Sequence, residues 1–266
     1  MGYKRRYDRL AYIVYRTYNF TFVNMPSKSM KGVLICGGTG SRLRPLTEIT
    51  NKSLLPVYDQ PLIYYPLNVL LKAGIREIVV ISGTEHIDQM ASFLGGGSRF
   101  GCDFSYKVQE KAGGIAQALG LAEEFAENDN ICAILGDNVF FDDLSTEIKN
   151  FKKGGHIFVK EVPDAARFGV VEIQNEKVLS IEEKPVKPKS SLAATGCYIY
   201  DARCFEVIRN LKPSERGEFE ITNVSDWYRK QGELTATILK DEWIDAGTFE
   251  SLHCAGVVVR KRKMIL

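Results

Sequence analysis

The sequence contains no continuous apolar run of about 18 residues or more, so it predicts no membrane-spanning helix. It also has almost no charge excess, because 35 Lys and Arg stand against 33 Asp and Glu, a formal net charge of +2. Because positive and negative charges nearly cancel, the chain has no general attraction to nucleic acid or to an anionic membrane. We expect neither as a partner. The 266 residues are 45% hydrophobic, as in an ordinary globular protein with a packed core.

Metal-binding patterns of cysteine and histidine are missing as well. None of the six cysteines stands in a CxxC pair, and the three histidines show no ligand spacing. We therefore expect free, buried thiols and a reducing, cytoplasmic location. The cysteines are Cys36, Cys102, Cys132, Cys197, Cys204 and Cys254.

The first 29 residues differ from the rest of the chain. They carry several basic residues and a single acid, Asp8, and a regular strand pattern starts only after Met30. The apolar patch at residues 10–15 is short for the core of a signal peptide. We predict a non-essential N-terminal extension, residues 1–29, followed by one domain over residues 30–266. A basic arm that contacts a partner is the alternative.

Beyond Met30, strand and helix signals alternate. Apolar or β-branched runs predict strands at residues 32–36, 77–82, 104–109 and 131–135, and helical spacing predicts helices at 62–73, 87–94 and 114–127. This alternation is typical of βαβ units around a parallel sheet. From about His156 the strand-like runs lie closer together, at residues 170–173, 178–182, 197–200 and 234–239. The prediction is an α/β fold with a mixed, mainly parallel central sheet flanked by helices.

A glycine-rich loop follows the first predicted strand. Its sequence, GGTGSR at residues 37–42, lacks the Gly-Lys-Ser/Thr of a P-loop, and Leu43 holds the place of the third Rossmann glycine. Glycines at this position let backbone N–H groups approach a phosphate chain, and Arg42 and Lys52 add positive charge. A plain tight turn is the alternative.

Two aspartates are candidates for binding a metal ion. Asp137 follows the buried run at residues 131–135, where ligands of open α/β sheets bind, and Asp245 precedes a glycine turn. Two carboxylates together with phosphate oxygens suit the octahedral shell of Mg²⁺. For Asp137 a helix cap is the alternative.

Another pattern, Glu183-Lys184-Pro185, ends a predicted strand. A carboxylate and an ammonium side by side match the hydroxyls and the dianion of a sugar phosphate. The proline predicts an extended backbone for Lys184. An exposed, charged strand end is the alternative.

In this order, these motifs resemble those of the glucose-1-phosphate thymidylyltransferases in the sugar nucleotidyltransferase family. The likeness extends from about Lys31 to Gly256, and it includes NKSLLPV at residues 51–57, FGVV at 168–171 and GEFEIT at 217–222. It implies a Rossmann-like nucleotidyltransferase fold and transfer from dTTP to glucose 1-phosphate, with release of pyrophosphate. It also implies Mg²⁺ as cofactor and a homo-oligomer.

The resemblance also assigns roles to single residues. Catalysis would depend on Arg42, Lys52, Asp137, Lys184 and Asp245, with Asp137 and Asp245 as metal ligands. The nucleotide would be bound by Gly37, Gly38, Gly40, Ser41, Arg42, Lys52, Gln109, Gly114 and Asp137. The sugar phosphate would be bound by Asn138, Gly169, Glu183, Lys184, Ala194 and Tyr198, with Glu218 and Trp243 nearby.

Some alternatives and departures from the family pattern stay open. UTP or another sugar 1-phosphate fits the same chemistry, since thymine and uracil differ by one methyl group. A non-catalytic nucleotide-sugar sensor is a second alternative. Ser53, Phe168 and Ala194 replace residues common in relatives. The C-terminal helical region of larger relatives is not expected after Val259, so feedback control through it is in doubt.

Overall fold

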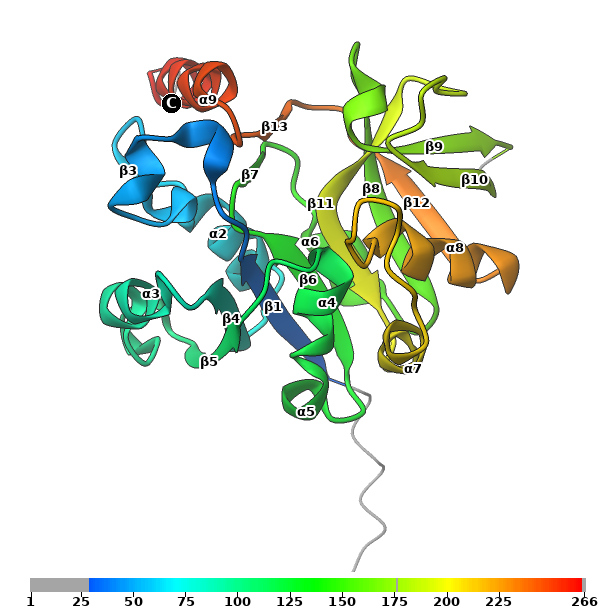
Figure 1. The fold of residues 1–266 in the computed structure, drawn as a ribbon, viewed down its shortest axis with the longest axis horizontal. Coiled ribbons are helices and arrows are strands. Elements are labelled where there is room, and N and C mark those ends of the chain that lie inside the picture. The colour runs from blue at the N-terminus through cyan, green and yellow to red at the C-terminus, as the bar shows by residue number, and fades with distance from the viewer. Residues whose placement is uncertain (1–28, 176, 265–266) are drawn as a thin grey trace, which may run out of the picture.

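A central sheet of nine strands organises the protein (Figure 1). The structure, a computed structural model, describes residues 29–175 and 177–264. The strands of this sheet are β1 (Met30–Cys36), β4 (Glu77–Gly83), β5 (Asp103–Gln109), β6 (Asn130–Leu135), β8 (Gly155–Glu161), β9 (Gly169–Gln174), β10 (Lys177–Glu183), β11 (Leu192–Tyr200) and β12 (Leu234–Ile238). Their order is β10-β9-β11-β6-β1-β4-β5, with β8 beside β11 and β12 beside β8.

The first half of the sheet is parallel, as predicted. Strand β1 lies between β4 and β6, and β5 extends the sheet beyond β4, all in parallel register. Strand β6 then meets β11 in antiparallel register, and β11 is also antiparallel to β8 and β9. The closely spaced strands of the second half are therefore mostly antiparallel additions to the same sheet, with β12 parallel to β8 at its edge. The predicted fold class is confirmed.

Helices cover both faces of this sheet, so alternate residues of β1 are buried in two different cores. Val33 and Ile35 pack with α4 (Ile115–Gly120), α5 (Glu123–Ala126), α7 (Arg203–Arg209) and α8 (Ile221–Lys230). Leu34 and Cys36 pack with α2 (Tyr64–Lys72), α3 (Ile87–Leu94) and α6 (Ser145–Asn150). Burial on both faces explains why residues 32–36 of β1 form a continuous run without a polar side chain.

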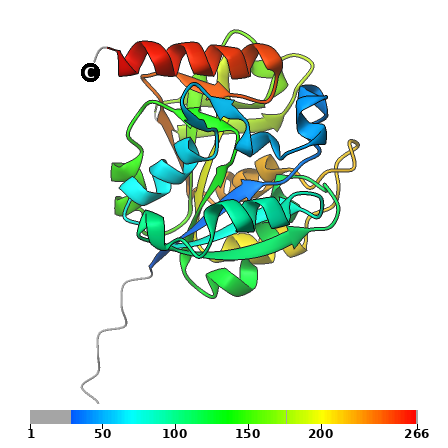
Figure 2. The same cartoon turned by 90° about the vertical axis from the view of Figure 1, so that its left-hand side faces the viewer.

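Two short sheets of two strands each stand apart from the main one. Strand β7 (Asn138–Phe140) pairs antiparallel with β13 (Trp243–Asp245), and β2 (Pro56–Val57) pairs with β3 (Gln60–Pro61). The last helix, α9 (Phe249–Lys263), follows β13 and runs along one edge of the molecule (Figure 2). Short 3₁₀ turns complete the chain: η1 (Ser41–Leu43), η2 (Leu46–Glu48), η3 (Lys52–Leu54), η4 (Ser98–Phe100) and η5 (Ala165–Arg167).

The remaining sequence predictions are settled in part. The helix expected at residues 114–127 is two short helices, α4 and α5, and the cysteines are free, with Cys254 exposed rather than buried. Apart from Ser29, the expected N-terminal extension lies outside the described residues. None of the helices within the described ranges combines the length and the apolarity needed to cross a membrane.

Candidate active site

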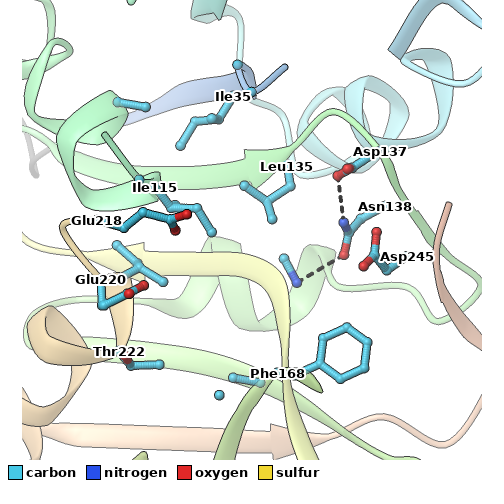
Figure 3. A pocket seen from close by; sticks show the side chains of 18 of the residues that line it. Ile35, Ile115, Leu135, Asp137, Asn138, Phe168, Glu218, Glu220, Thr222 and Asp245 are labelled. Carbon is cyan, nitrogen blue, oxygen red and sulfur yellow. Dashed lines mark hydrogen bonds between the residues drawn. The ribbon is translucent and has the colours of Figure 1, made fainter. Parts of the chain in front are cut away.

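A cavity of about 580 Å³ opens beyond the carboxyl ends of β1 and β6 and reaches across to the antiparallel half of the sheet. Figure 3 shows Asp137, Asn138 and Asp245 together at one end, with Glu218, Glu220 and Thr222 at the other. Almost every site residue predicted from the sequence lines this cavity. These are Gly37, Gly38, Ser41, Arg42, Lys52, Gln109, Gly114, Asp137, Asn138, Gly169, Glu183, Lys184, Ala194, Tyr198, Glu218, Trp243 and Asp245.

Gly40 is the exception, because it does not line the cavity. It has a left-handed backbone with φ +60°, and its carbonyl accepts hydrogen bonds from Leu43 N at 2.9 Å and from Thr47 Oγ1 at 2.8 Å. A Cβ atom at residue 40 would lie 2.8 Å from the Thr47 methyl group. Gly40 therefore shapes the turn that presents Ser41 and Arg42, and it does so through its backbone.

Gln109, the last residue of β5, lies directly against the glycine loop. A Cβ atom on Gly37 would lie only 2.1 Å from Gln109 Oε1, so only glycine lets the loop approach this amide. Gln109 Nε2 donates to Gln117 Oε1 at 2.7 Å and to the Gly114 carbonyl at 3.3 Å. Gly114 itself has φ +101°, and a side chain there would meet the backbone of Phe219. These bonds fix an amide edge at the mouth of the loop.

Lys52 and Asp137 form a buried ion pair at the same end of the cavity as Asp245. Lys52 Nζ lies 2.5 Å from Asp137 Oδ2. Burial alone favours the neutral forms, but the Lys52 charge holds the pKa of Asp137 below its usual value, and the Asp137 charge raises the pKa of Lys52. Both groups are therefore charged, with the ammonium facing the same cavity as the glycine loop.

Asn138 orients this carboxylate. Its Nδ2 donates to Asp137 Oδ1 at 3.0 Å, the bond drawn in Figure 3. Its Oδ1 accepts from Gly196 N at 3.1 Å and from Trp243 Nε1 at 2.7 Å. The Asn138 side chain is thus buried between three strands, β7, β11 and β13, and acts on the site by holding Asp137 in place.

Asp245 lies beside Asp137 because β13 pairs with β7, where Asp245 stands opposite Asn138. Burial raises the pKa of Asp245 to about 6, and the Asp137 charge adds to the rise, while Lys52 and Arg42 oppose it. A Cβ atom on Gly247 would lie 2.7 Å from Arg42 Nη2 and 3.0 Å from Asp245 Oδ1. Gly247 therefore leaves room for the Arg42 guanidinium near this carboxylate.

This donor set fits Mg²⁺ in a specific way. The only carboxylates at this end of the cavity, within the described ranges, are those of Asp137 and Asp245. No cluster of three or more His, Cys, Asp or Glu residues suited to a metal occurs in the described part of the chain. Two oxygen ligands leave most of an octahedral shell to phosphate oxygens and water, as expected for a cation that binds with its nucleotide.

Glu183 and Lys184 lie across the cavity from these groups, at the end of β10. The predicted extended backbone of Lys184 is wrong, because its φ is +42°, in the left-handed region. An extended backbone would send successive side chains to opposite faces. The left-handed residue, whose N–H donates to the Phe168 carbonyl at 3.0 Å, instead turns both side chains toward the cavity, with Lys184 Nζ 3.6 Å from Glu183 Oε1.

The sequence prediction missed an arginine at this end. Arg216 contacts three carboxylates: Glu183 at 3.4 Å, Glu220 at 3.2 Å and Glu218 at 3.1 Å. Burial raises the pKa of Glu183, and the charge of Glu220 adds to the rise, while Lys184 and Arg216 oppose it. The GEFEIT motif at residues 217–222 marked this segment, but the basic residue just before it could be placed only by the fold.

Further lining residues were also not foreseen. Arg167 lies at the cavity wall next to Phe168, whose ring packs edge-on against Trp243 at 5.2 Å. The others are Ile35, Ala112, Ile115, Ala118, Leu135, Thr195, Gly196, Glu220, Ile221 and Thr222. Glu220, Ile221 and Thr222 belong to the GEFEIT motif, whereas the rest of this list is apolar or small, so the sequence of the rest carries no signal of a site.

Comparison with known proteins agrees with this geometry. The model of the nucleotidyl transferase family matches residues 31–262. The chain belongs to this family. Its members include a glucose-1-phosphate thymidylyltransferase of Neisseria meningitidis, which is 47% identical over 87% of this chain and 83% of the relative. One from Mycobacterium tuberculosis is 43% identical over 87% of this chain and 82% of the relative.

Comparison with solved structures agrees with this assignment to the nucleotidyl transferase family. A crystal structure of a putative glucose-1-phosphate thymidylyltransferase from Bacillus anthracis has a TM-score of 0.83 and 51% identity, covering 87% of this chain and 96% of that one. A UDP-glucose pyrophosphorylase complexed with UDP-glucose has a TM-score of 0.78 but only 22% identity, and it shows the fold alone. The chain is therefore an enzyme that transfers nucleotidyl groups.

Proposed function

We propose that the enzyme transfers a thymidylyl group from dTTP to glucose 1-phosphate, giving dTDP-glucose and pyrophosphate. The supporting observation is one cavity with a glycine loop, two cationic side chains and two aspartates at one end, and three glutamates, a lysine and an arginine at the other. Relatives that are 43–47% identical over most of the chain carry the name of this activity.

The triphosphate belongs at the glycine loop. Gly37 and Gly38 allow close backbone approach, and Arg42 and Lys52 supply positive charge beside it. Gln109, held by Gln117, then presents its amide to the base at the mouth of the loop. Asp137 and Asp245 would hold Mg²⁺, which offsets the negative charge of the phosphates when it is bound.

The sugar phosphate belongs at the opposite end. Lys184 and Arg216 would bind its phosphate, and Glu183 would accept hydrogen bonds from sugar hydroxyls. A phosphate oxygen of the sugar substrate attacks the α-phosphorus of dTTP, the bond to the β-phosphate oxygen breaks, and pyrophosphate leaves. No protein nucleophile is required because the attacking group is already an anion. The protein accelerates this step by positioning the two substrates and by neutralising their charge.

The test is a substrate panel. Pyrophosphate release is measured with dTTP, UTP, CTP, ATP and GTP, each against several sugar 1-phosphates. We expect the highest kcat/KM with dTTP and glucose 1-phosphate. A higher kcat/KM with UTP or with another sugar would replace the proposed substrates, and binding without pyrophosphate release would indicate a nucleotide-sugar sensor.

A further inference from the structure

The side-chain amide of Gln109 has a defined direction. Gln109 is only 5% exposed, and its Nε2 lies 3.3 Å from the Gly114 carbonyl and 2.7 Å from Gln117 Oε1. A carbonyl oxygen can only accept a hydrogen bond, so the Gln109 atom beside it must be the nitrogen. The other end of the amide, Oε1, therefore points at Gly37 of the glycine loop, where a Cβ atom would lie only 2.1 Å away.

Gln117, on α4, holds this direction. Its Oε1 accepts from Gln109 Nε2 and also from Gly113 N at 3.2 Å. A backbone N–H can only donate, so Gln117 presents its oxygen, and not its nitrogen, to Gln109. A Cβ atom on Gly113 would lie 2.9 Å from Gln117 Cδ, so the glycine leaves room for this amide. Backbone groups thus fix the orientation of both side chains.

The contact with Gln117 is the stronger of the two restraints on Gln109. It is 2.7 Å long, against 3.3 Å for the bond to the Gly114 carbonyl. The Gly114 carbonyl also accepts from Ala118 N at 3.2 Å, so it keeps a partner when the Gln109 amide turns. Loss of the Gln117 oxygen would therefore remove the main obstacle to reversal of this amide.

Gln109 Oε1 is an acceptor that a ligand can use. It receives no hydrogen bond from the described residues, and Gln109 lines the cavity. A buried acceptor favours a ligand that supplies a donor. The N3–H group of thymine or uracil is such a donor, whereas N3 of cytosine carries no hydrogen and is itself an acceptor. Cytosine has its donor one ring position away, on N4.

We propose that Gln117 is a positioning residue that sets the base specificity of the enzyme. By keeping the oxygen of Gln109 toward the base, it favours pyrimidines with a hydrogen on N3 over cytosine. Gln117 does not itself line the cavity, so it acts through Gln109. The proposal rests on the thymidylyl transfer proposed above, and it names the group of the base that is recognised.

The test compares kcat/KM for dTTP and dCTP, each with saturating glucose 1-phosphate. Gln117→Met keeps a similar length without a strong acceptor, and it should lower the dTTP-to-dCTP ratio about three- to tenfold, the effect of one hydrogen bond. Gln117→Glu offers an oxygen to both donors and should keep the ratio, even where its charge lowers both kcat/KM values. Gln231→Met is the matched control, the same substitution at an exposed glutamine, and should leave the ratio unchanged.

A double variant separates action through Gln109 from a general effect on the fold. In Gln109→Met the amide beside the base is gone, so adding Gln117→Met should not change the ratio further. Thermal melts check that each variant is folded, and Gln117→Leu is a second variant without an acceptor.

Three results would overturn the role of Gln117. They are an unchanged ratio in folded Gln117→Met and Gln117→Leu, a fall in Gln117→Glu as large as in Gln117→Met, and a fall that persists when Gln109 is already methionine. A wild-type enzyme that prefers dCTP to dTTP would instead overturn the proposed substrate, so the two failures are told apart by the wild type alone.

Discussion

At the scale of single residues, the two aspartates carry the most specific expectation. Asp137 directly precedes β7 and Asp245 ends β13, and the two lie together at one end of the cavity. Asp137 is buried and Asp245 is partly buried. Asparagine has nearly the same shape as aspartate but carries no charge, so it tests the charge with little change in packing.

We expect Asp137→Asn and Asp245→Asn each to lower kcat by about 10²–10³. The measurement is pyrophosphate release at saturating Mg²⁺, together with a thermal melt that shows whether the fold is intact. Either variant with a kcat near that of the wild type would remove that residue from the proposed metal site.

Lys184 tests which substrate binds at the far end. Lys184→Ala should lower kcat/KM about ten- to a hundredfold, the loss of one charged hydrogen bond, mainly through a higher KM for glucose 1-phosphate. Steady-state kinetics with each substrate varied in turn separate the two KM values. A larger effect on the KM for dTTP would move Lys184 to the triphosphate, and unchanged kinetics would make it a solvated surface charge.

The same residue shows what the sequence could and could not predict about the site. The motif Glu183-Lys184-Pro185 predicted two charged groups at a strand end, and both face the cavity. The proline rule predicted an extended Lys184, yet the backbone is left-handed because the N–H of Lys184 bonds the Phe168 carbonyl. Such a long-range bond has no local sequence signal.

At the scale of elements, long apolar runs were predictable and short ones were not. Strands β1 and β6 are buried on both faces, so each contains an unbroken run without polar side chains, at residues 32–36 and 131–135, that is easily recognised. Strands β7 and β13 have three residues each, too few for a period to be recognised, and the pairing between them exists only in the folded chain. That Asp137 and Asp245 would lie together was therefore suggested by the ligand chemistry of Mg²⁺ and by the family likeness, not by a strand pattern.

From His156 on strand β8 we predict that the stability of the fold depends on pH. His156 on this strand bonds Thr235 Oγ1 through Nδ1 at 2.7 Å and packs against Phe158, and burial lowers its pKa from 6.5 to about 4. Between these values the unfolded chain binds a proton that the folded chain does not, so stability falls as pH falls from 6.5 toward 4. Above pH 6.5 the residue is neutral in both states and has no such effect.

We expect the wild type to lose about 2 kcal/mol more than His156→Asn between pH 7 and pH 5. Asparagine can keep a hydrogen bond to Thr235 but does not titrate. Urea unfolding at the two pH values gives the free energies of unfolding. Equal losses in both proteins would show that His156 is protonated in the folded state at pH 5.

At the scale of the whole molecule, we predict that the fold does not depend on the first 28 residues. Ser29 closes the lower end of β1 through bonds from its N and Oγ to the Asp129 carboxylate, at 3.0 and 2.6 Å. Deleting residues 1–28 keeps these bonds, so we expect the melting temperature, kcat and oligomeric mass to stay unchanged. A clear drop in melting temperature on deletion would mean that the segment packs on the rest of the protein.

The pairing of β7 with β13 has a consequence for how the site is assembled. Asn138 and Trp243 are hydrogen-bonded across 105 positions of sequence, so two strands of three residues each must close a very long loop. Closing such a loop costs conformational entropy, which disfavours the pairing. Only a few backbone hydrogen bonds between the two strands offset this cost directly. If Asp137 and Asp245 hold a metal–nucleotide complex, that complex would bind only when both strands are in place, and its binding would stabilise their pairing. At a ligand concentration about a hundred times its dissociation constant, binding would add about 2.7 kcal/mol to the free energy of unfolding. Thermal stability would then report, with no turnover, whether both ends of the loop have met.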